Sequence, residues 1–317
     1  MEGDFPFRHD DEIGFVAVKN GRTVRRHLAS GLRYHLFTDD RGARVNAPTE
    51  GTPPRVDLVT IGCSFAWGHG VENEDTFTEQ LRRRVGITVA NFALAGYGTV
   101  HSLLLLRREL DLRPRVVVYG FIDDHLQRNL SPCAPNYAPF CAPVAHVVLD
   151  GDGRPAIGPP DPRLFSVELN RRFYEEITMT DGFSVRDVLW RARMDLFRLR
   201  QTRAIEFPTD MRSQSTTMRW LIGRLAEETR RAGATLVIVR IPGLEPGAAA
   251  SPPPALTAAT AAHDVILVDL TPAVDRYWAS EPNGSLHLTG DGHPNRTAHA
   301  LIATELEREL RSRRLLE

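Results

Sequence analysis

Short apolar runs alternate with amphipathic helical stretches from Val56 to the end of the chain, and this alternation constrains the fold more than any other feature. Each run suits a strand buried on both faces, and the stretches between the runs are long enough for the crossovers that parallel strands require. The sequence therefore predicts an α/β protein with a parallel sheet covered by helices on both sides. Five strands are expected, at Val56–Ile61, Ile87–Asn91, Val116–Tyr119, Thr235–Val239 and Val265–Asp269.

Helices are expected between these strands and after the last one. A capping box of Thr76 and Glu79 begins one helix. Capping and periodicity together predict helices at Thr76–Arg84, Val100–Leu110 and Met218–Ala232. Pro294 suits the first position of a closing helix, whose apolar face is formed by Ala298, Leu301, Ile302, Leu306 and Leu310.

Two segments stand outside the alternation. Residues 1–55 are expected to form an N-terminal accessory hairpin from strands at Phe15–Lys19 and Arg33–Phe37, ahead of a main domain at residues 56–317. An insertion at about residues 129–218 separates the third and fourth strands, so it is expected to cap the edge where α/β sheets bind ligands. Within it the sequence predicts a hairpin at Val147–Ile157 and helices near Leu164–Glu176 and Val185–Leu199.

The charged residues nearly cancel, with 39 lysines and arginines against 40 aspartates and glutamates. Without excess positive charge the chain is not expected to bind nucleic acid. The uncharged stretch Val85–Leu106 could cross a bilayer by length, but its glycines, Asn91 and His101 favour a strand, a loop and a helix start. Met1–Asp11 does not resemble a signal peptide, so the cytoplasm is the default expectation unless a leader has been cleaved.

Cys133 and Cys141 lie in the proline-rich loop Ser131–Pro143. Their spacing allows a short-range disulfide bridge if the protein meets an oxidising compartment. Two free thiols explain the pattern equally well, and both interpretations stay open.

A serine stands directly after the first predicted strand, in the segment Ile61–Gly68. A serine on a tight turn past a buried strand is exposed at the sheet edge, near backbone N–H groups able to bind an anion. The segment Asn91–Gly98 follows the second strand, where glycine lets the backbone present its N–H to a ligand. Taken alone, each segment is better explained by an ordinary strand end or turn.

The segment Gly290–Asn295 supplies a base. Pro294 at the first helical position puts His293 at the helix N-terminus, where the dipole disfavours the imidazolium and keeps the ring neutral. Asp291 is close enough in sequence to orient that ring and to stabilise the cation formed when it takes a proton. Ser64, His293 and Asp291 therefore form a candidate catalytic triad.

Taken in order, these blocks resemble the SGNH hydrolases, the superfamily of GDSL lipases and esterases. The blocks are Gly-x-Ser-Phe after the first strand, Asn-x-x-x-x-Gly-Tyr-Gly after the second, an Asp-Asp pair after the third and Asp-Gly-His-Pro-Asn before the last helix. The resemblance covers most of the chain from Val56 onward, excluding the insertion. It implies a three-layer flavodoxin-like fold and a hydrolase of carboxylic esters, often acetyl or other small acyl groups on carbohydrates.

The resemblance also implies roles for individual residues. Ser64 would be the nucleophile that carries an acyl-enzyme, His293 the general base and Asp291 its orienter, with no cofactor or metal. The Ser64 and Gly96 N–H groups would form two arms of the oxyanion hole. Cys63 replaces the family's aspartate and is expected to be a small packing residue.

Asp123 stands where the family usually has the asparagine that gives the third oxyanion donor. An ionised carboxylate cannot donate a hydrogen bond. Asp123 is therefore expected either to be kept protonated by burial and neighbouring Asp124, or to leave a hole with two donors.

Other functions remain alternatives. An acyltransferase could use the same serine, and a non-catalytic carbohydrate-binding or scaffold protein could have kept the fold after losing a donor. A metal site is a third alternative because four metal-binding side chains crowd one segment, although their spacing matches no compact zinc motif; these are His287, Asp291, His293 and His299. The expected partner is a small-molecule or carbohydrate ester, and the sequence identifies no residues that bind it.

Overall fold

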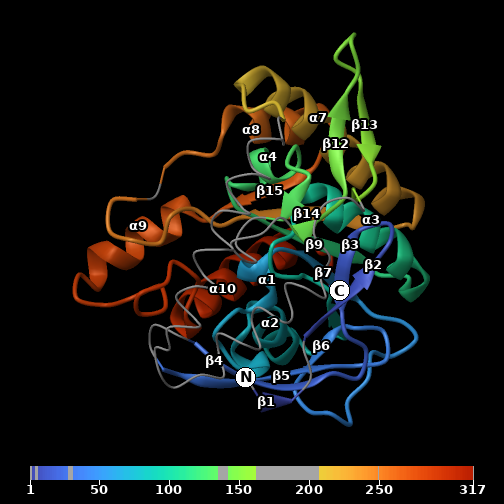
Figure 1. The fold of residues 1–317 in the computed structure, drawn as a ribbon. Helices are drawn as coiled ribbons and strands as arrows, with labels where there is room; N and C mark the ends of the chain where they lie inside the picture. Colours follow the sequence, from blue (N-terminus) through green and yellow to red (C-terminus); the bar gives the residue numbers. More distant parts are fainter. Residues whose placement is uncertain are drawn as a thin grey trace, which may run out of the picture.

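The computed structural model describes residues 2–3, 6–27, 31–134, 142–161, 207–248 and 250–316 of the 317-residue chain. Within these ranges the largest sheet has nine strands in the order β1-β4-β5-β6-β8-β7-β9-β14-β15 (Figure 1). Its parallel part has the order β8-β7-β9-β14-β15, which is 2-1-3-4-5 in chain order, as in flavodoxin-like folds. These strands are β7 (Leu58–Gly62), β8 (Val89–Asn91), β9 (Val116–Phe121), β14 (Thr235–Arg240) and β15 (Ile266–Asp269).

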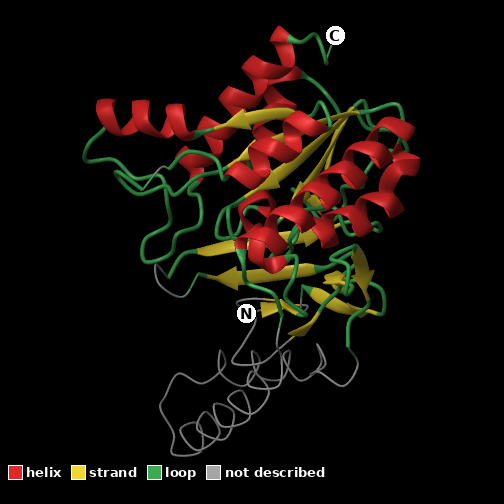
Figure 2. Cartoon of the chain, turned by 90° about the horizontal axis from the view of Figure 1, so that it is seen from above, coloured by secondary structure: helices red, strands yellow, loops and turns green. Residues whose placement is uncertain are grey.

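Helices cover both faces of the parallel strands, and Figure 2 shows the strands between them. Because strand residues alternate between faces, Val118 packs in a cluster with α2 and α10, whereas Val117 packs in a second cluster with α3 and α7. The first face carries α2 (Phe77–Val85), α9 (Thr271–Ser280) and α10 (Arg296–Ser312). The second face carries α3 (Thr99–Glu109), α7 (Met211–Arg231) and α8 (Pro254–Ala262). The expected three-layer α/β architecture is confirmed.

The N-terminal segment extends the sheet through antiparallel strands. These are β1 (Glu2–Gly3), β4 (Arg22–Arg26), β5 (Arg33–Thr38) and β6 (Arg44–Val45). The strand β6 joins the parallel part where Arg44 pairs with Asn91 of β8. The domain boundary near residue 55 stays a prediction.

The expected pairing of Phe15–Lys19 with Arg33–Phe37 is wrong. The first strand is β3 (Gly14–Ala17), which pairs with β2 (Phe7–Asp10) in a separate two-stranded sheet. The strand β5 instead pairs with β4, whose sequence Arg-Thr-Val-Arg-Arg carries no apolar run that would indicate a strand.

The described part of the insertion begins after α4 (His125–Arg128) with β10 (Cys133–Ala134) and β11 (Ala142–Pro143). The predicted hairpin is present as β12 (His146–Leu149) and β13 (Pro155–Gly158), which project from the body of the molecule in Figure 1. The two helices predicted at Leu164–Glu176 and Val185–Leu199 lie outside the described residues. Among the helices that the structure describes, none has the length and apolarity needed to cross a membrane.

The closing helix begins later than predicted. Asn295 is its N-cap and accepts a hydrogen bond from the Ala298 N–H at 3.1 Å, so α10 starts at Arg296. Pro294 therefore lies before the helix and bridges to His287 as an isolated strand pair. His293 belongs to this loop, two residues before the N-cap Asn295, so the expected placement at the helix N-terminus is wrong.

Candidate active site

Ser64 begins α1 (Ser64–Trp67), a four-residue helix that starts two residues after β7 ends. Gly62 pairs with Gly120 of β9 and has a φ of +141°, which side-chain-bearing residues rarely adopt. A Cβ on Gly62 would lie 2.6 Å from the Gly120 oxygen, and a Cβ on Gly120 would lie 2.6 Å from the Ala66 Cβ. The two glycines therefore let the serine helix pack directly against the central strands.

Cys63 is the N-cap of α1 and is fully buried. Burial raises the pKa of its thiol, which disfavours the reactive thiolate. Both observations agree with the packing role expected from the sequence.

The carbonyl groups at the end of α1 are bound by two side chains from other strands. Asn91 Nδ2 donates to the Ala66 oxygen at 3.1 Å, and Arg44 Nη1 donates to the Trp67 and Gly68 oxygens at 2.5 and 2.6 Å. These carbonyls lack partners within a helix, so they need donors from elsewhere. Burial lowers the pKa of Arg44 to about 10, which still leaves the guanidinium protonated at neutral pH.

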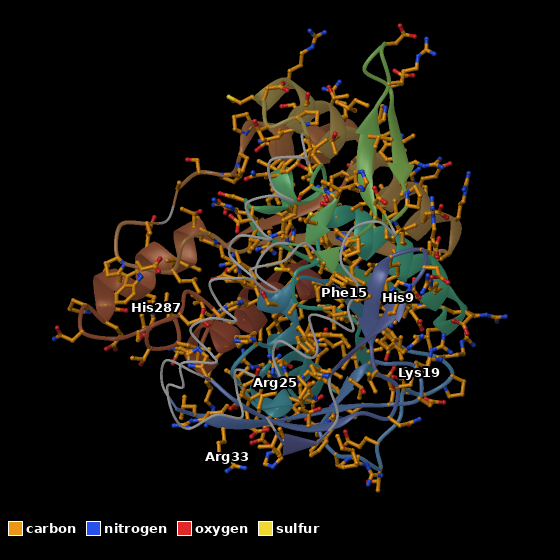
Figure 3. The ribbon with its side chains drawn as sticks, viewed as in Figure 1. His9, Phe15, Lys19, Arg25, Arg33 and His287 are labelled. Atoms are coloured by element: carbon orange, nitrogen blue, oxygen red, sulfur yellow. The ribbon has the colours of Figure 1, made fainter. Side chains whose placement is uncertain are left out.

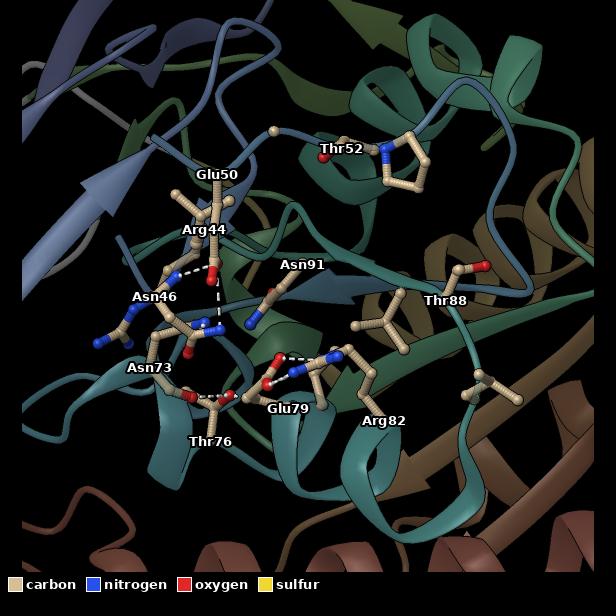
Figure 4. A pocket seen from close by; sticks show the side chains of 16 residues that line it. Arg44, Asn46, Glu50, Thr52, Asn73, Thr76, Glu79, Arg82, Thr88 and Asn91 are labelled. Carbon is tan, nitrogen blue, oxygen red and sulfur yellow. Dashed lines mark hydrogen bonds and ion pairs between the residues drawn. The ribbon is translucent and has the colours of Figure 1, made fainter. Parts of the chain in front are cut away.

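Arg44 and Asn91 also line a cavity of about 250 Å³ beside α2. Figure 4 shows the side chains that surround it, including Glu79 and its ion-pair partner Arg82. The two side chains that bind the carbonyl groups of α1 are therefore also part of the wall of this cavity.

The structure brings Ser64, His293 and Asp291 together. His293 Nε2 lies 2.8 Å from Ser64 Oγ, and His293 Nδ1 forms a short hydrogen bond with Asp291 Oδ1. The backbone N–H of His293 donates to the same Asp291 oxygen at 3.0 Å. In this arrangement the imidazole can accept the serine proton at Nε2 while its other nitrogen is held by a carboxylate.

Asp291 is held in its ionised form by its neighbours. Although burial raises its pKa, the hydrogen bonds from His293 and His27, with the charge of His293, bring the pKa well below its usual range. His27 Nε2 bonds Asp291 Oδ2 at 3.0 Å, and it comes from the end of β4, 264 residues earlier in the chain. The sequence reasoning missed His27, because no motif surrounds it.

His69 completes the histidine cluster around Asp291. Its ring centroid lies 4.5 Å from that of His293, and its Nε2 lies 3.7 Å from Asp291 Oδ2. Burial, and then the neighbouring His293, lower the pKa of His69 to about 3, so its ring is neutral at pH 7. The sequence reasoning missed His69 also, although it stands only five residues after Ser64.

Gly96 lies in the loop after β8, beside the serine turn. The Leu94 N–H donates to the Gly62 oxygen at 2.9 Å, which ties this loop to the end of β7. Gly96 has a φ of +83°, a left-handed conformation that favours glycine. Within the part of the chain that the structure describes, neither the Gly96 nor the Ser64 backbone N–H donates to another residue, so both are available to an anion.

Asp123 forms an ion pair with Arg240 instead of presenting a donor. Arg240 Nε and Nη2 donate to its two carboxylate oxygens at 3.1 and 2.7 Å. Arg240 is almost fully buried at the end of β14 and also pairs with Asp269 at 3.3 Å. A carboxylate beside a guanidinium acts as an acceptor, and this favours the alternative of a hole with two donors. Arg240 directly follows the apolar run Thr235–Val239. A charged residue at the end of a buried strand was the signal that the sequence reasoning overlooked.

The four residues of the suggested metal site, His287, Asp291, His293 and His299, do not form one cluster of metal-binding atoms. His299 is fully buried in α10, where its Nδ1 accepts a hydrogen bond from the Phe77 N–H at 3.2 Å. His287 lies in the segment between α9 and α10 (Figure 3), where its Nδ1 is 3.1 Å from the Leu288 oxygen. Within the described ranges a different set, His27, His69 and Asp291, has three atoms able to bind a metal within 4.8 Å of one another. Of these, His27 Nε2 and Asp291 Oδ2 already share a hydrogen bond.

Cys133 is disulfide-bonded. Cys141 lies outside the described residues, so the pairing of the two cysteines stays a prediction. Cys63 is a free thiol.

No protein-family model matches this chain, and no curated protein matches it. Several solved structures are similar to it at low sequence identity. TesA is 14% identical with a TM-score of 0.42, over 80% of this chain and 98% of that chain. A lipolytic protein of the G-D-S-L family from Desulfitobacterium hafniense is 12% identical with a TM-score of 0.39, over 79% of this chain and 97% of that chain.

A third similar structure is a catalytic mutant of an acetylxylan esterase from Geobacillus stearothermophilus. It is 12% identical with a TM-score of 0.41, over 82% of this chain and 96% of that chain.

Proposed function

We propose that this protein is a serine-dependent carboxylic-ester hydrolase that works through an acyl-enzyme on Ser64. The observation that carries the proposal is the hydrogen-bonded chain Ser64, His293 and Asp291, in which His293 Nε2 lies 2.8 Å from the serine oxygen. A serine hydroxyl is a weak nucleophile until an adjacent base accepts its proton. The assembled triad also opposes a purely binding or scaffold function.

In the first half of the reaction Ser64 Oγ attacks the ester carbonyl and passes its proton to His293 Nε2. Asp291 stabilises the imidazolium through Nδ1, and the Ser64 and Gly96 N–H groups stabilise the negative oxygen of the tetrahedral intermediate. His293 then gives the proton to the departing alcohol, which leaves the acyl group on Ser64.

In the second half His293 takes a proton from water, and the resulting hydroxide attacks the acyl-enzyme. The carboxylic acid departs, and the proton returns from His293 to Ser64 Oγ. An alcohol in place of water would give acyl transfer, with the same residues in the same roles. Product analysis with and without an added alcohol acceptor distinguishes hydrolysis from transfer.

Labelling with a fluorophosphonate tests the nucleophile and its activation together. We expect stoichiometric labelling of the wild-type protein at the peptide that contains Ser64, and none of Ser64→Ala. Ser251→Ala is the matched control, because Ser251 is exposed and lies outside the site. Labelling at another serine, or full labelling of Ser64→Ala, would refute the proposal.

The substrate class that we propose is an acetyl or other small acyl ester of a carbohydrate or natural product. This follows the resemblance noted in the sequence. Rates on activated esters of increasing acyl length, followed by acetylated sugars, test it. A preference for long acyl chains would contradict the acetyl assignment while leaving the serine mechanism standing.

A further inference from the structure

His27 is held in place by the N-terminal part of the sheet. It follows β4 directly, and only 5% of its surface is exposed. Its backbone N–H donates to the Leu32 oxygen at 2.7 Å, and its oxygen accepts from the Gly31 N–H at 2.8 Å. These bonds, together with the pairing of β4 and β5, fix the backbone from which the imidazole extends to Asp291.

The Asp291 carboxylate uses both of its oxygens. Oδ1 is hydrogen-bonded to the backbone N–H and to the ring Nδ1 of His293. Oδ2 is hydrogen-bonded to His27 Nε2 at 3.0 Å. His69 does not replace His27, because its Nε2 is 3.7 Å from Oδ2, beyond hydrogen-bond distance. Asp291 lies in a loop. The orientation of its carboxylate is therefore set by the hydrogen bonds to its two oxygens rather than by a helix or strand.

We propose that His27 is a positioning residue of the catalytic site, acting through Asp291. This inference rests on the proposed function. During the reaction Asp291 must stay ionised and aligned while His293 carries the extra proton. A donor on Oδ2 favours the ionised carboxylate and prevents its rotation about the Cβ–Cγ bond. The N-terminal extension thus completes a site whose other members lie at the ends of the parallel strands and before α10.

Two other roles would fit the position of His27. It could be a buried packing residue, or it could bind a metal ion together with His69 and Asp291. A metal ligand must present a nitrogen without a proton, whereas a donor to a carboxylate must carry one. The experiment therefore has to separate donation from packing and from metal binding.

The experiment compares His27→Leu and His27→Gln with the wild type. Leucine has no donor, whereas the glutamine amide can place an N–H near the position of Nε2. We expect His27→Leu to lower kcat on an activated acetyl ester by about ten- to hundredfold, the usual cost of losing a hydrogen bond to a charged group. We expect KM to stay unchanged and His27→Gln to restore most of kcat. Fluorophosphonate labelling should slow in parallel.

A second measurement does not depend on esterase activity. The Nδ1–H proton of His293, followed by NMR, should exchange with water faster in His27→Leu than in the wild type and His27→Gln. If the wild type neither hydrolyses esters nor labels while this dependence holds, the proposed function fails and the positioning role stands. Equal exchange in all three proteins overturns the positioning role.

The matched control is His35→Leu, which removes an exposed histidine from the neighbouring strand β5. It should leave kcat and exchange unchanged. If His27→Leu does not fold, His27→Asn replaces it, because its shorter amide cannot reach Oδ2. An equal loss in the leucine and glutamine variants would assign His27 to packing, and loss of wild-type activity in EDTA would assign it to metal binding. Either result overturns the proposal.

Discussion

The ends of β7 and β14 flank β9 on the same edge of the sheet, and their side chains differ in kind. Near the end of β7, Asp291 is surrounded by His27, His69 and His293. At the end of β14, Arg240 is held between Asp123 and Asp269. The first group is three imidazole rings around one carboxylate, and the second is a guanidinium between two carboxylates.

This difference suits two separate tasks. In the histidine group, the His293 ring lies within hydrogen-bond distance of Ser64 Oγ. The ion-paired group holds loops together, since Arg240 Nη1 also donates to the Ala250 oxygen at 2.5 Å and to Thr271 Oγ1 at 2.8 Å. Pairing with Asp123 and Asp269 raises the pKa of Arg240 despite its burial, which alone would lower it. One edge of the sheet therefore carries both the candidate catalytic residues and an ion-paired group that joins loops.

The largest expected effect is the loss of the reacting pair near β7. Ser64→Ala and His293→Ala should each lower kcat by roughly a millionfold, and the double variant should be no worse than either single one, because triad members act as a unit. Ester hydrolysis at saturating substrate measures this, with circular dichroism to confirm folding. Additive losses would contradict a shared mechanism.

Arg240→Met should affect stability rather than chemistry. Removing one member of a buried ion pair costs about 3–5 kcal/mol, and we expect about 3 kcal/mol here because Asp123 is partly exposed and regains water. Urea unfolding measures the change, and activity per folded molecule should stay close to that of the wild type. Arg154→Met, at a highly exposed arginine in the turn before β13, is the control and should change stability very little. A loss of activity without a loss of stability would move Arg240 into the reaction.

Asp123→Asn tests whether the residue paired with Arg240 also lies next to the oxyanion that forms on the substrate at Ser64. The amide would supply the missing donor while Arg240 keeps Asp269, so the maximal rate should rise by up to about a hundredfold. The basic limb of the pH profile should not shift, because both Asp123 oxygens accept hydrogen bonds from Arg240 and neither acts as a donor. If the variant instead stays active to higher pH than the wild type, Asp123 acts in the wild type as a protonated carboxyl that donates a hydrogen bond to the oxyanion. An unchanged rate and profile would place Asp123 outside the hole.

The smallest expected effect is a pH slope in stability that comes from three buried histidines. Burial lowers the pKa of His69, His101 and His299 to about 3 from an ordinary value of 6.5. Between these values the unfolded chain binds protons that the folded chain does not, so stability falls as pH falls. Each histidine contributes up to about 1.4 kcal/mol per pH unit in that window.

His299→Asn tests this slope, because its amide oxygen can still accept the Phe77 N–H while the titrating ring is gone. The free energy of unfolding, measured from pH 7 to pH 4.5, should fall less steeply in the variant than in the wild type. Equal slopes would show that His299 does not remain neutral in the folded protein.

The presence of parallel strands between helices, and the meeting of Ser64, His293 and Asp291, could be predicted from the sequence. Both depend on local patterns: buried strands are apolar runs, and a serine or histidine beside glycines at a strand end or loop is recognisable within a few residues. The pairing of β4 with β5 was missed, because Arg22–Arg26 has no apolar alternation. The start of α10 was misplaced because Pro294 suits a first helical position but here precedes the cap.

Only the tertiary structure decided which distant groups meet. His27 contacts Asp291 across 264 residues, Arg44 from the N-terminal segment binds the carbonyl groups at the end of α1, and Arg240 binds Asp123 across 117 residues. No local pattern encodes these contacts, because each follows from the order in which strands join the sheet and from which loops that order brings to one edge. A single hydrogen bond between distant residues leaves no periodicity in the sequence, and only the folded chain makes it visible.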